Sequence, residues 1–281
     1  PNSIVQKLTR GKDGLMNSAT AIHSSELKEF QIRAKAFVLC ASTIESTRIL
    51  LNSNLEKTRG YPVLGKYLND HIGGPKSLMI EGLFNDQGTA LADERQRILF
   101  IPRHQNTRGS EKLWPYQRGY TTRVILNRVN RFQLRFTLTA FGEPLPYEKN
   151  TVTLDPSRLD RWGSSAVKIH FEVRDNERRM FECMKWDLKK IAESLSQEKG
   201  AEISNAYLGK IEPGLCNHEV GTARMGSDPD TSFLNSHSRS HDIENLYVTD
   251  GSGFTSLGAA NPTLTLMALT YRACRDLGKR I

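Results

Sequence analysis

An uninterrupted apolar run near the beginning of the chain most constrains its fold. The run extends from Ala36 to Ala41 and is followed directly by a helical pattern over residues 43–52. A strand without polar alternation is typical of a parallel sheet that is buried on both faces. Residues 245–250 form a second strand pattern, and a helical pattern begins at Pro262, a residue that suits the first position of a helix. These two strand-and-helix units predict an α/β fold.

Patterns of another kind occupy the middle of the chain and predict an antiparallel sheet. Asp175 is predicted to cap a long amphipathic helix that packs against this sheet. A short β-meander with a turn at Asp13-Gly14 is predicted before residue 36. The apolar face of the long helix consists of Met180, Phe181, Met184, Leu188, Ile191 and Leu195. The expected strands lie at 78–83, 98–101, 121–128, 131–140, 151–154 and 166–171, with a turn at Asp155-Pro156.

Charge and hydropathy narrow the possible partners. The chain has 281 residues and a formal net charge of +8, which admits an anionic partner. Its Lys and Arg residues are scattered, however, and the densest cluster lies among strand-like residues between Arg123 and Arg135. A nucleic-acid partner is therefore not predicted, although a basic binding module remains an alternative. No run of roughly 18 apolar residues occurs, so no membrane span is predicted.

The cysteines give no sign of a metal or disulfide framework. Cys40, Cys183, Cys216 and Cys274 are widely spaced and form no CxxC pair, so no metal site is predicted. Cys216 lies two residues before His218, but buried inert thiols are commoner than catalytic ones. We therefore assign no nucleophilic role to this residue.

His218 is the main candidate for acid–base chemistry. It stands in the segment NHEVGTARMG, just before a glycine-containing turn at Gly221. Histidine titrates near neutrality, so a fixed neutral imidazole can take the proton of a hydroxyl group as hydride leaves the carbon. A single histidine is more often a surface residue or a satisfied core residue. The surrounding pattern is what favours the catalytic interpretation.

Asn261 has two interpretations. It directly precedes Pro262, where its side chain could cap the following helix. Alternatively, it hydrogen-bonds a substrate hydroxyl while the positive end of the helix stabilises negative charge on a reduced cofactor. Both interpretations remain open from the sequence.

Two loops are candidates for cofactor contacts. Cys40, Ala41 and Ser42 join the first predicted strand to its helix, where backbone amides can meet a phosphate group or an adenine edge, and Ser42 or Thr43 is available as the helix cap. Asp250-Gly251 ends the second strand and could approach a pyrophosphate or ribityl chain, although a tight turn explains the glycine equally well. His71 is predicted to have a structural hydrogen-bonding role rather than a catalytic one.

Together these segments resemble the C-terminal portion of the glucose-methanol-choline (GMC) family of FAD-dependent oxidoreductases. The resemblance rests on AKAFVLCASTIESTRILLNS at 34–53, LGKYLNDH at 64–71, HEVGTARMG at 218–226, and residues 245–277. The last two segments are the more specific. The final block is most similar to sugar- and glucoside-oxidising dehydrogenases and pyranose oxidases.

The resemblance implies FAD as cofactor and an alcohol, such as a sugar or glycoside hydroxyl, as substrate. His218 would be the catalytic base, Asn261 the second active-site residue, and hydride would pass to flavin N5. The electron acceptor stays open between oxygen, a quinone and a cytochrome. Phe136, Thr139, Phe141 and Glu143 are candidates for the substrate-facing wall. The residues expected near FAD are Cys40, Ala41, Ser42, Asp250, Gly251, Pro262 and Thr263.

The same resemblance implies the domain organisation. Residues 1–74 and 215–281 would form a partial FAD/NAD(P)-binding-like domain, interrupted at 75–214 by a substrate-binding domain with an antiparallel sheet and helices. The expected fold is thus α/β (α+β).

The GxGxxG fingerprint that binds the FAD pyrophosphate in this family is not found in the sequence. The chain is therefore expected to be the second half of such an enzyme and inactive alone. A cytoplasmic or periplasmic location stays open, since any export signal would precede this part. A non-catalytic subunit that needs a separate GxGxxG-containing chain is the remaining alternative.

Overall fold

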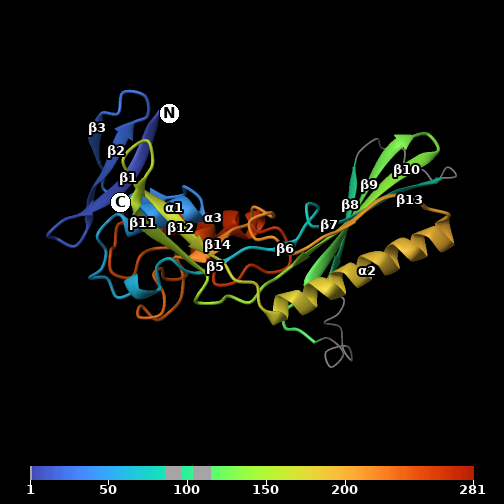
Figure 1. The fold of residues 1–281 in the computed structure, drawn as a ribbon. Helices are drawn as coiled ribbons and strands as arrows, with labels where there is room; N and C mark the ends of the chain where they lie inside the picture. Colours follow the sequence, from blue (N-terminus) through green and yellow to red (C-terminus); the bar gives the residue numbers. More distant parts are fainter. Residues whose placement is uncertain (1, 86–95, 104–114) are drawn as a thin grey trace.

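The structure is a computed structural model that describes residues 2–85, 96–103 and 115–281. Figure 1 shows two lobes, one containing helices α1 and α3 and the other containing a large sheet covered by helix α2. Each lobe has its own hydrophobic core. This mixed α/β architecture with an antiparallel sheet agrees with the coarse fold class that the sequence predicts.

The first lobe is built from small sheets and two helices. The antiparallel sheet β1-β2-β3 realises the predicted meander, and β4 pairs in parallel with β15. The antiparallel pair β5 and β14 brings residues 66–69 beside residues 220–222. The bounds are β1 Ser3–Arg10, β2 Met16–His23, β3 Glu29–Arg33, β4 Phe37–Leu39, α1 Thr43–Leu51, β5 Lys66–Asn69, β14 Val220–Thr222, β15 Leu246–Val248 and α3 Thr263–Leu277, with short 3-10 helices at Tyr61–Val63 and Gly251–Gly253.

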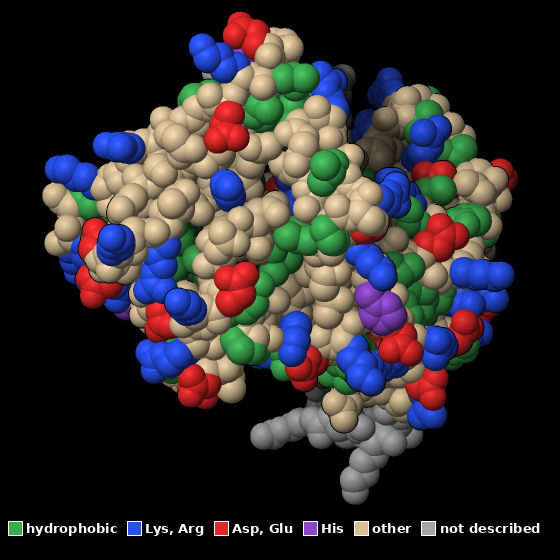
Figure 2. All heavy atoms as spheres, turned by 60° about the vertical axis from the view of Figure 1, so that its left-hand side comes forward, with side chains coloured by type: hydrophobic (Ala, Val, Ile, Leu, Met, Phe, Trp, Pro, Cys, Tyr) green, Lys and Arg blue, Asp and Glu red, His purple; other side chains and the backbone are tan. Residues whose placement is uncertain are grey.

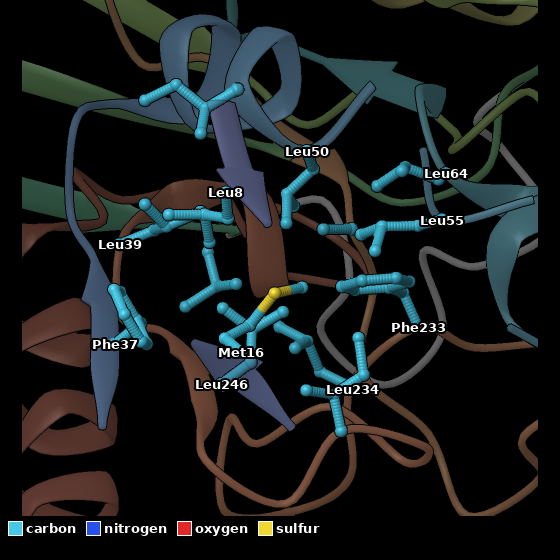
Figure 3. Packing of buried hydrophobic residues seen from close by; sticks show 14 of the residues in the cluster. Leu8, Met16, Phe37, Leu39, Leu50, Leu55, Leu64, Phe233, Leu234 and Leu246 are labelled. Atoms are coloured by element: carbon cyan, nitrogen blue, oxygen red, sulfur yellow. The ribbon is translucent and has the colours of Figure 1, made fainter. Parts of the chain in front are cut away.

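The core of this lobe gathers residues from both ends of the chain. Side chains from β1, β2, β4 and α1 point toward others from residues 223–248 (Figure 3). Leu50 and Leu246 are fully buried at its centre. Strand β4 itself is buried on one face only, because Phe37 and Leu39 point into this core while Val38 is 41% exposed. The expectation of a strand buried on both faces is therefore wrong for the described chain.

The second lobe is an antiparallel sheet in the order β13-β7-β10-β9-β8, with β6 paired to the end of β10. Helix α2 lies across the sheet (Figure 1). Its predicted apolar face is confirmed, since Met180, Met184 and Leu188 are fully buried. The bounds are β6 Ile72–Gly73, β7 Leu78–Asn85, β8 Arg97–Pro102, β9 Tyr120–Asn130, β10 Gln133–Gly142, α2 Asp175–Lys199 and β13 Glu202–Leu208.

Several local expectations are corrected. Asp175 is the first residue of α2 rather than its cap, because Arg174 holds the cap position and donates its backbone N–H to Glu177 Oε2 at 3.2 Å. Ser42 does hold the N-cap position of α1, one of the two expected caps, but its side chain makes no capping hydrogen bond to the described residues. The hairpin of β11 (Thr151–Leu159) and β12 (Ser165–His170) contains Asp155-Pro156 at a register shift, and it is separate from the large sheet.

The hairpin β11–β12 packs on the first lobe. Arg48 of α1 forms an ion pair with Asp160 at 3.1 Å, and the Trp162 indole donates to the Ser24 carbonyl at 3.2 Å. The sequence interval 75–214 thus contributes to both lobes, and its bounds as a domain stay a prediction.

Gly221 allows the close approach of β14 to β5. Its φ is +88°, and a Cβ atom at this position would lie 2.2 Å from the Tyr67 carbonyl oxygen. Gly163 has a similar φ of +79°, but no atom of the described residues lies within 4 Å of its Cβ position. The two glycines share a left-handed backbone conformation, but an added methyl group would clash with backbone only at Gly221. Gly163 is therefore a matched control for Gly221.

We expect Gly221→Ala to lower the free energy of unfolding much more than Gly163→Ala. Both variants incur the cost of roughly 1–2 kcal/mol for a left-handed non-glycine residue, and only Gly221→Ala adds a clash with backbone. Urea titration followed by circular dichroism measures both losses. Equal losses would show that the approach of β14 to β5 tolerates a methyl group.

Candidate active site

His218 lies in the loop before β14 and is half-buried. The preceding residue, Asn217, adopts a positive φ of 55°, which turns the chain toward the junction of the two lobes. The His218 backbone N–H donates to Asp70 Oδ1 at 3.1 Å. Burial lowers the pKa of His218 below its usual value, Arg123 lowers it further, and Glu219 opposes them. The imidazole is therefore neutral near pH 7 and able to accept a proton.

Asp70 anchors this loop from the short connection between β5 and β6. The residue is 3% exposed. Its Oδ1 also accepts a hydrogen bond from the backbone N–H of His71 at 2.7 Å. Its other oxygen, Oδ2, has no hydrogen-bond partner among the described residues. Burial, and then repulsion from Glu219, raise the pKa of Asp70 to about 6. One carboxylate oxygen thus holds the backbones of two histidines.

His71 lies beneath His218 and is 3% exposed. Its Nδ1 is 2.9 Å from His218 Nδ1, and its Nε2 is 3.0 Å from the Gly258 carbonyl oxygen. The two rings meet edge to face, with centroids 5.0 Å apart and planes at 85°. Burial lowers the pKa of His71 to about 3, and His218 contributes to the shift. The expected structural hydrogen-bonding role agrees with these contacts.

Asn261 lies on the other side of His218. Its Nδ2 is 3.0 Å from His218 Nε2, and its side chain is exposed. Pro262, rather than Asn261, holds the N-cap position of α3, and it makes no capping side-chain bond. The capping interpretation of Asn261 and the placement of Pro262 inside the helix are therefore both corrected. The structure brings His218 and Asn261 together across 43 residues of sequence.

Phe141 forms an aromatic wall beside the histidines. Its ring centroid is 5.7 Å from that of His71 and 5.9 Å from that of His218. The Arg123 guanidinium lies over the Phe141 ring, 5.0 Å from its centroid. Of the other wall candidates, Phe136 is buried in the core of the second lobe, and Glu143 forms an ion pair with Arg103. Thr139 is buried on β10, two residues before Phe141, and pairs across the strands with Arg123.

The two loops expected near FAD are joined through Ser46. The Ser46 hydroxyl donates to Asp250 Oδ2, and the Ala41 backbone N–H donates to the Ser46 oxygen at 3.1 Å. The other oxygen of Asp250 accepts from the backbone and hydroxyl of Ser252. Both oxygens of Asp250 are therefore already hydrogen-bonded, which fits the interpretation of this segment as a tight turn. In contrast, Cys40, Ala41 and Ser42 are exposed.

The Cys216 thiol bonds to backbone rather than to a histidine. It donates to the Gly73 carbonyl at 3.2 Å, and burial raises its pKa to about 12. A thiol in this state is not a nucleophile near neutral pH. The adjacent pair His241 and Asp242 also forms no relay, because His241 bonds to Ser232 while Asp242 pairs with Arg59.

Sequence reasoning missed the functional placement of Asp70 and Arg123. The segment LNDH drew attention to Asp70 only through the family resemblance. Arg123 was noted only as a member of a cluster of basic residues in a strand pattern, which gives no signal of a contact with Phe141. Neither the contact of Asp70 with residue 218 nor that of Arg123 with Phe141 follows a sequence periodicity.

The described residues contain no group of three or more histidine, cysteine, aspartate or glutamate side chains arranged to hold a metal ion. No helix in ranges 2–85, 96–103 and 115–281 is long and apolar enough to cross a membrane. Figure 2 shows Lys and Arg side chains interspersed with acidic ones over the visible face, rather than gathered in one patch.

Comparisons with known proteins point to one family. Residues 146–270 match the family model described as GMC oxidoreductase. The chain is 28% identical over 298 residues to 2-methyl-1,2-propanediol dehydrogenase of Mycolicibacterium austroafricanum, covering 96% of this chain and 52% of that protein. It is 37% identical over 295 residues to 6'''-hydroxyparomomycin C oxidase of Streptomyces lividus, covering 98% of this chain and 50% of that protein.

A solved structure shares the fold. The FAD-dependent oxidoreductase from Chaetomium thermophilum superimposes with a TM-score of 0.67 at 13% identity, covering 100% of this chain and 61% of that one. The chain spans about half the length of each of the two relatives named above, from Mycolicibacterium austroafricanum and Streptomyces lividus.

The buried neutral state of His71 makes stability depend on pH. Its pKa is about 3 in the folded protein and 6.5 when unfolded, so the unfolded state binds more protons between these values and stability falls as pH decreases from 6.5. Asp70 has the opposite effect. Its pKa is raised from 3.8 to about 6 in the folded protein, so its contribution to stability increases as the pH falls between these values. The other titratable groups beside His71 and Asp70 are His218, Glu219 and Cys216.

We expect the stability advantage of the wild type over His71→Asn to shrink by about 3 kcal/mol between pH 7 and pH 4, because the variant lacks the suppressed imidazole. Denaturant titrations at both pH values measure the difference. His170→Asn, at an exposed position on β12, should keep a constant difference. A pH-independent gap for His71→Asn would show that His71 titrates normally in the fold.

Proposed function

Since residues 146–270 carry the C-terminal domain of the GMC oxidoreductase family, we propose that this chain is the proton-abstracting half of an FAD-dependent enzyme that oxidises an alcohol, with His218 as the base. The observation that most supports the proposal is the pairing of His218 Nε2 with Asn261 Nδ2 at 3.0 Å, at the start of α3. A base and an amide donor side by side are the two groups that a reacting hydroxyl needs.

The geometry suggests how the two side chains act. A substrate hydroxyl that displaces the Asn261 amide from His218 Nε2 would donate its hydrogen to that nitrogen, and its oxygen would accept from Asn261 Nδ2. As the O–H bond breaks and the N–H bond forms, negative charge grows on the oxygen, which favours departure of hydride from the carbon. Asn261 stabilises that charge and fixes the oxygen in line with His218. When bound, FAD would supply the hydride acceptor, flavin N5.

The surroundings of the pair fit a flavin in two respects. Thr263 and Leu264, in the first turn of α3, are exposed, and no side chain caps the helix. A helix N-terminus of this kind stabilises an anion, such as a reduced flavin, placed beside Asn261. The exposed loop of residues 40–42 offers further backbone groups. Asp250 is a poorer candidate for FAD contact than the sequence suggests, because its carboxylate is already engaged by Ser46 and Ser252.

For the substrate we propose a polyhydroxylated alcohol such as a sugar or glycoside. The Phe141 ring beside His218 can pack on the C–H face of a sugar ring. Arg123 adds hydrogen-bond donors at the same wall, and its Nε is buried without a hydrogen-bond partner among the described residues. The relative named for hydroxyparomomycin C oxidation supports this class, whereas the diol dehydrogenase supports a smaller alcohol.

We expect His218→Ala, in the full polypeptide that contains this chain, to slow flavin reduction by roughly 10²–10⁴-fold, the scale of a lost general base. Anaerobic stopped-flow absorbance with a panel of sugars and short diols measures the rate. His170→Ala removes an exposed histidine on β12 and should reduce flavin at the wild-type rate. Flavin reduction by His218→Ala at an undiminished rate would remove His218 from the proposed role.

Asn261→Ala should lower kcat by about 10²-fold, as loss of one donor to a developing oxyanion does, while the flavin content stays that of the wild type. The reason is that Asn261 contacts His218 and caps no helix. Flavin absorbance per polypeptide and steady-state kinetics are measured on the same preparation. Loss of flavin together with helix content would instead indicate a structural role at the start of α3.

A further inference from the structure

The contacts of His71 determine where hydrogen atoms lie on both histidine rings. A backbone carbonyl oxygen accepts hydrogen bonds and donates none. His71 Nε2, 3.0 Å from the Gly258 carbonyl oxygen, must therefore carry a hydrogen. A neutral imidazole has only one N–H group, so His71 Nδ1 carries none and accepts a hydrogen bond.

The neutral state of His71 follows from its surroundings. The residue is 3% exposed, and its ring lies against Phe141 and His218. Burial lowers its pKa to about 3, so the doubly protonated ring is absent near neutral pH. His71 Nδ1 can then only accept, and the atom 2.9 Å away, His218 Nδ1, must be the donor.

We propose that His71 is a positioning residue that holds His218 in a single tautomer, with hydrogen on Nδ1 and an unprotonated, hydrogen-bond-accepting Nε2. The consequence for catalysis rests on the proposed function, whereas the tautomer itself does not. His218 Nε2 is the nitrogen that lies 3.0 Å from Asn261 Nδ2. The amide donates to this lone pair, and a substrate hydroxyl that takes the place of the amide would donate to the same nitrogen.

Asp70 completes the arrangement by holding both backbones. Its Oδ1 accepts from the N–H of His71 at 2.7 Å and from the N–H of His218 at 3.1 Å. The two rings are thereby kept at the separation that their Nδ1–Nδ1 hydrogen bond requires. His71 sets which nitrogen of His218 is unprotonated, and Asp70 sets where that nitrogen lies.

The tautomers can be measured directly in the full polypeptide labelled with ¹⁵N-histidine. Two-bond ¹H–¹⁵N correlation spectra distinguish a protonated ring nitrogen from an unprotonated one. We expect opposite tautomers on the two rings near pH 7.5, with Nδ1–H on His218 and Nε2–H on His71. His218→Ala and His71→Asn assign the signals. Nε2–H on His218, or the same tautomer on both rings, would overturn the proposal.

A pair of variants separates positioning from folding. His71→Phe keeps an aromatic ring and removes the acceptor, whereas His71→Asn places an amide oxygen close to the position of Nδ1. We expect His71→Phe to lose the single His218 tautomer and to lower kcat by about 10- to 100-fold with little change in KM, the scale of a lost orienting partner. His71→Asn should restore the Nδ1–H tautomer and most of kcat. Equal kcat losses in both folded variants would contradict the positioning role.

Failure of the proposed function gives a different result. If the wild-type tautomers are as expected but His218→Ala oxidises alcohols normally, the positioning stands and the catalytic assignment falls. Because the wild-type spectrum needs no variant to fold, the tautomer prediction is tested even if His71→Phe is unstable.

Discussion

The hydrogen bonds of Asp70 Oδ1 hold together the parts of the molecule on which the candidate site depends. Asp70 and His71 occupy the connection between β5, which pairs with β14 in the first lobe, and β6, which pairs with β10 in the second. The same carboxylate oxygen reaches the backbone of His218, just before β14. His218, the candidate base in the first lobe, is thereby fixed relative to Phe141 of β10 in the second lobe.

The connection that contains Asp70 and His71 lowers the free energy of unfolding, which is a reason to regard it as functional. Asp70 is nearly fully buried, its pKa is raised, and its Oδ2 lacks a partner among residues that the structure describes. His71 is buried in its neutral form. Burial of unpaired polar atoms opposes folding, and sites that break the ordinary rules of satisfied polarity tend to be sites of chemistry. The hydrophobic cores of the two lobes offset this local cost.

Local pattern predicted much of the architecture, and long-range contact explains the rest. Helix α2 and the β1–β2 hairpin follow from periodicity and turn residues within one segment. The exposed face of β4 at Val38 and the edge strand β13 could not be predicted, because neighbours distant in sequence decide which face is covered and which edge is extended. His218 and Asn261 were identified from sequence as separate candidates. Their contact depends on tertiary structure, as does the contact between His71 and His218, which are 147 residues apart in the sequence.

The arrangement also determines where a proton taken by His218 can go. Once protonated, His218 would carry hydrogens on both nitrogens, and its Nδ1–H would still point at His71. His71 cannot take that hydrogen onward, because its pKa is about 3 and its own N–H is held by the Gly258 carbonyl. The negative charge of Glu219 favours the charged form of His218. Under the proposed function, a proton taken by His218 would therefore leave through Nε2, beside the exposed Asn261.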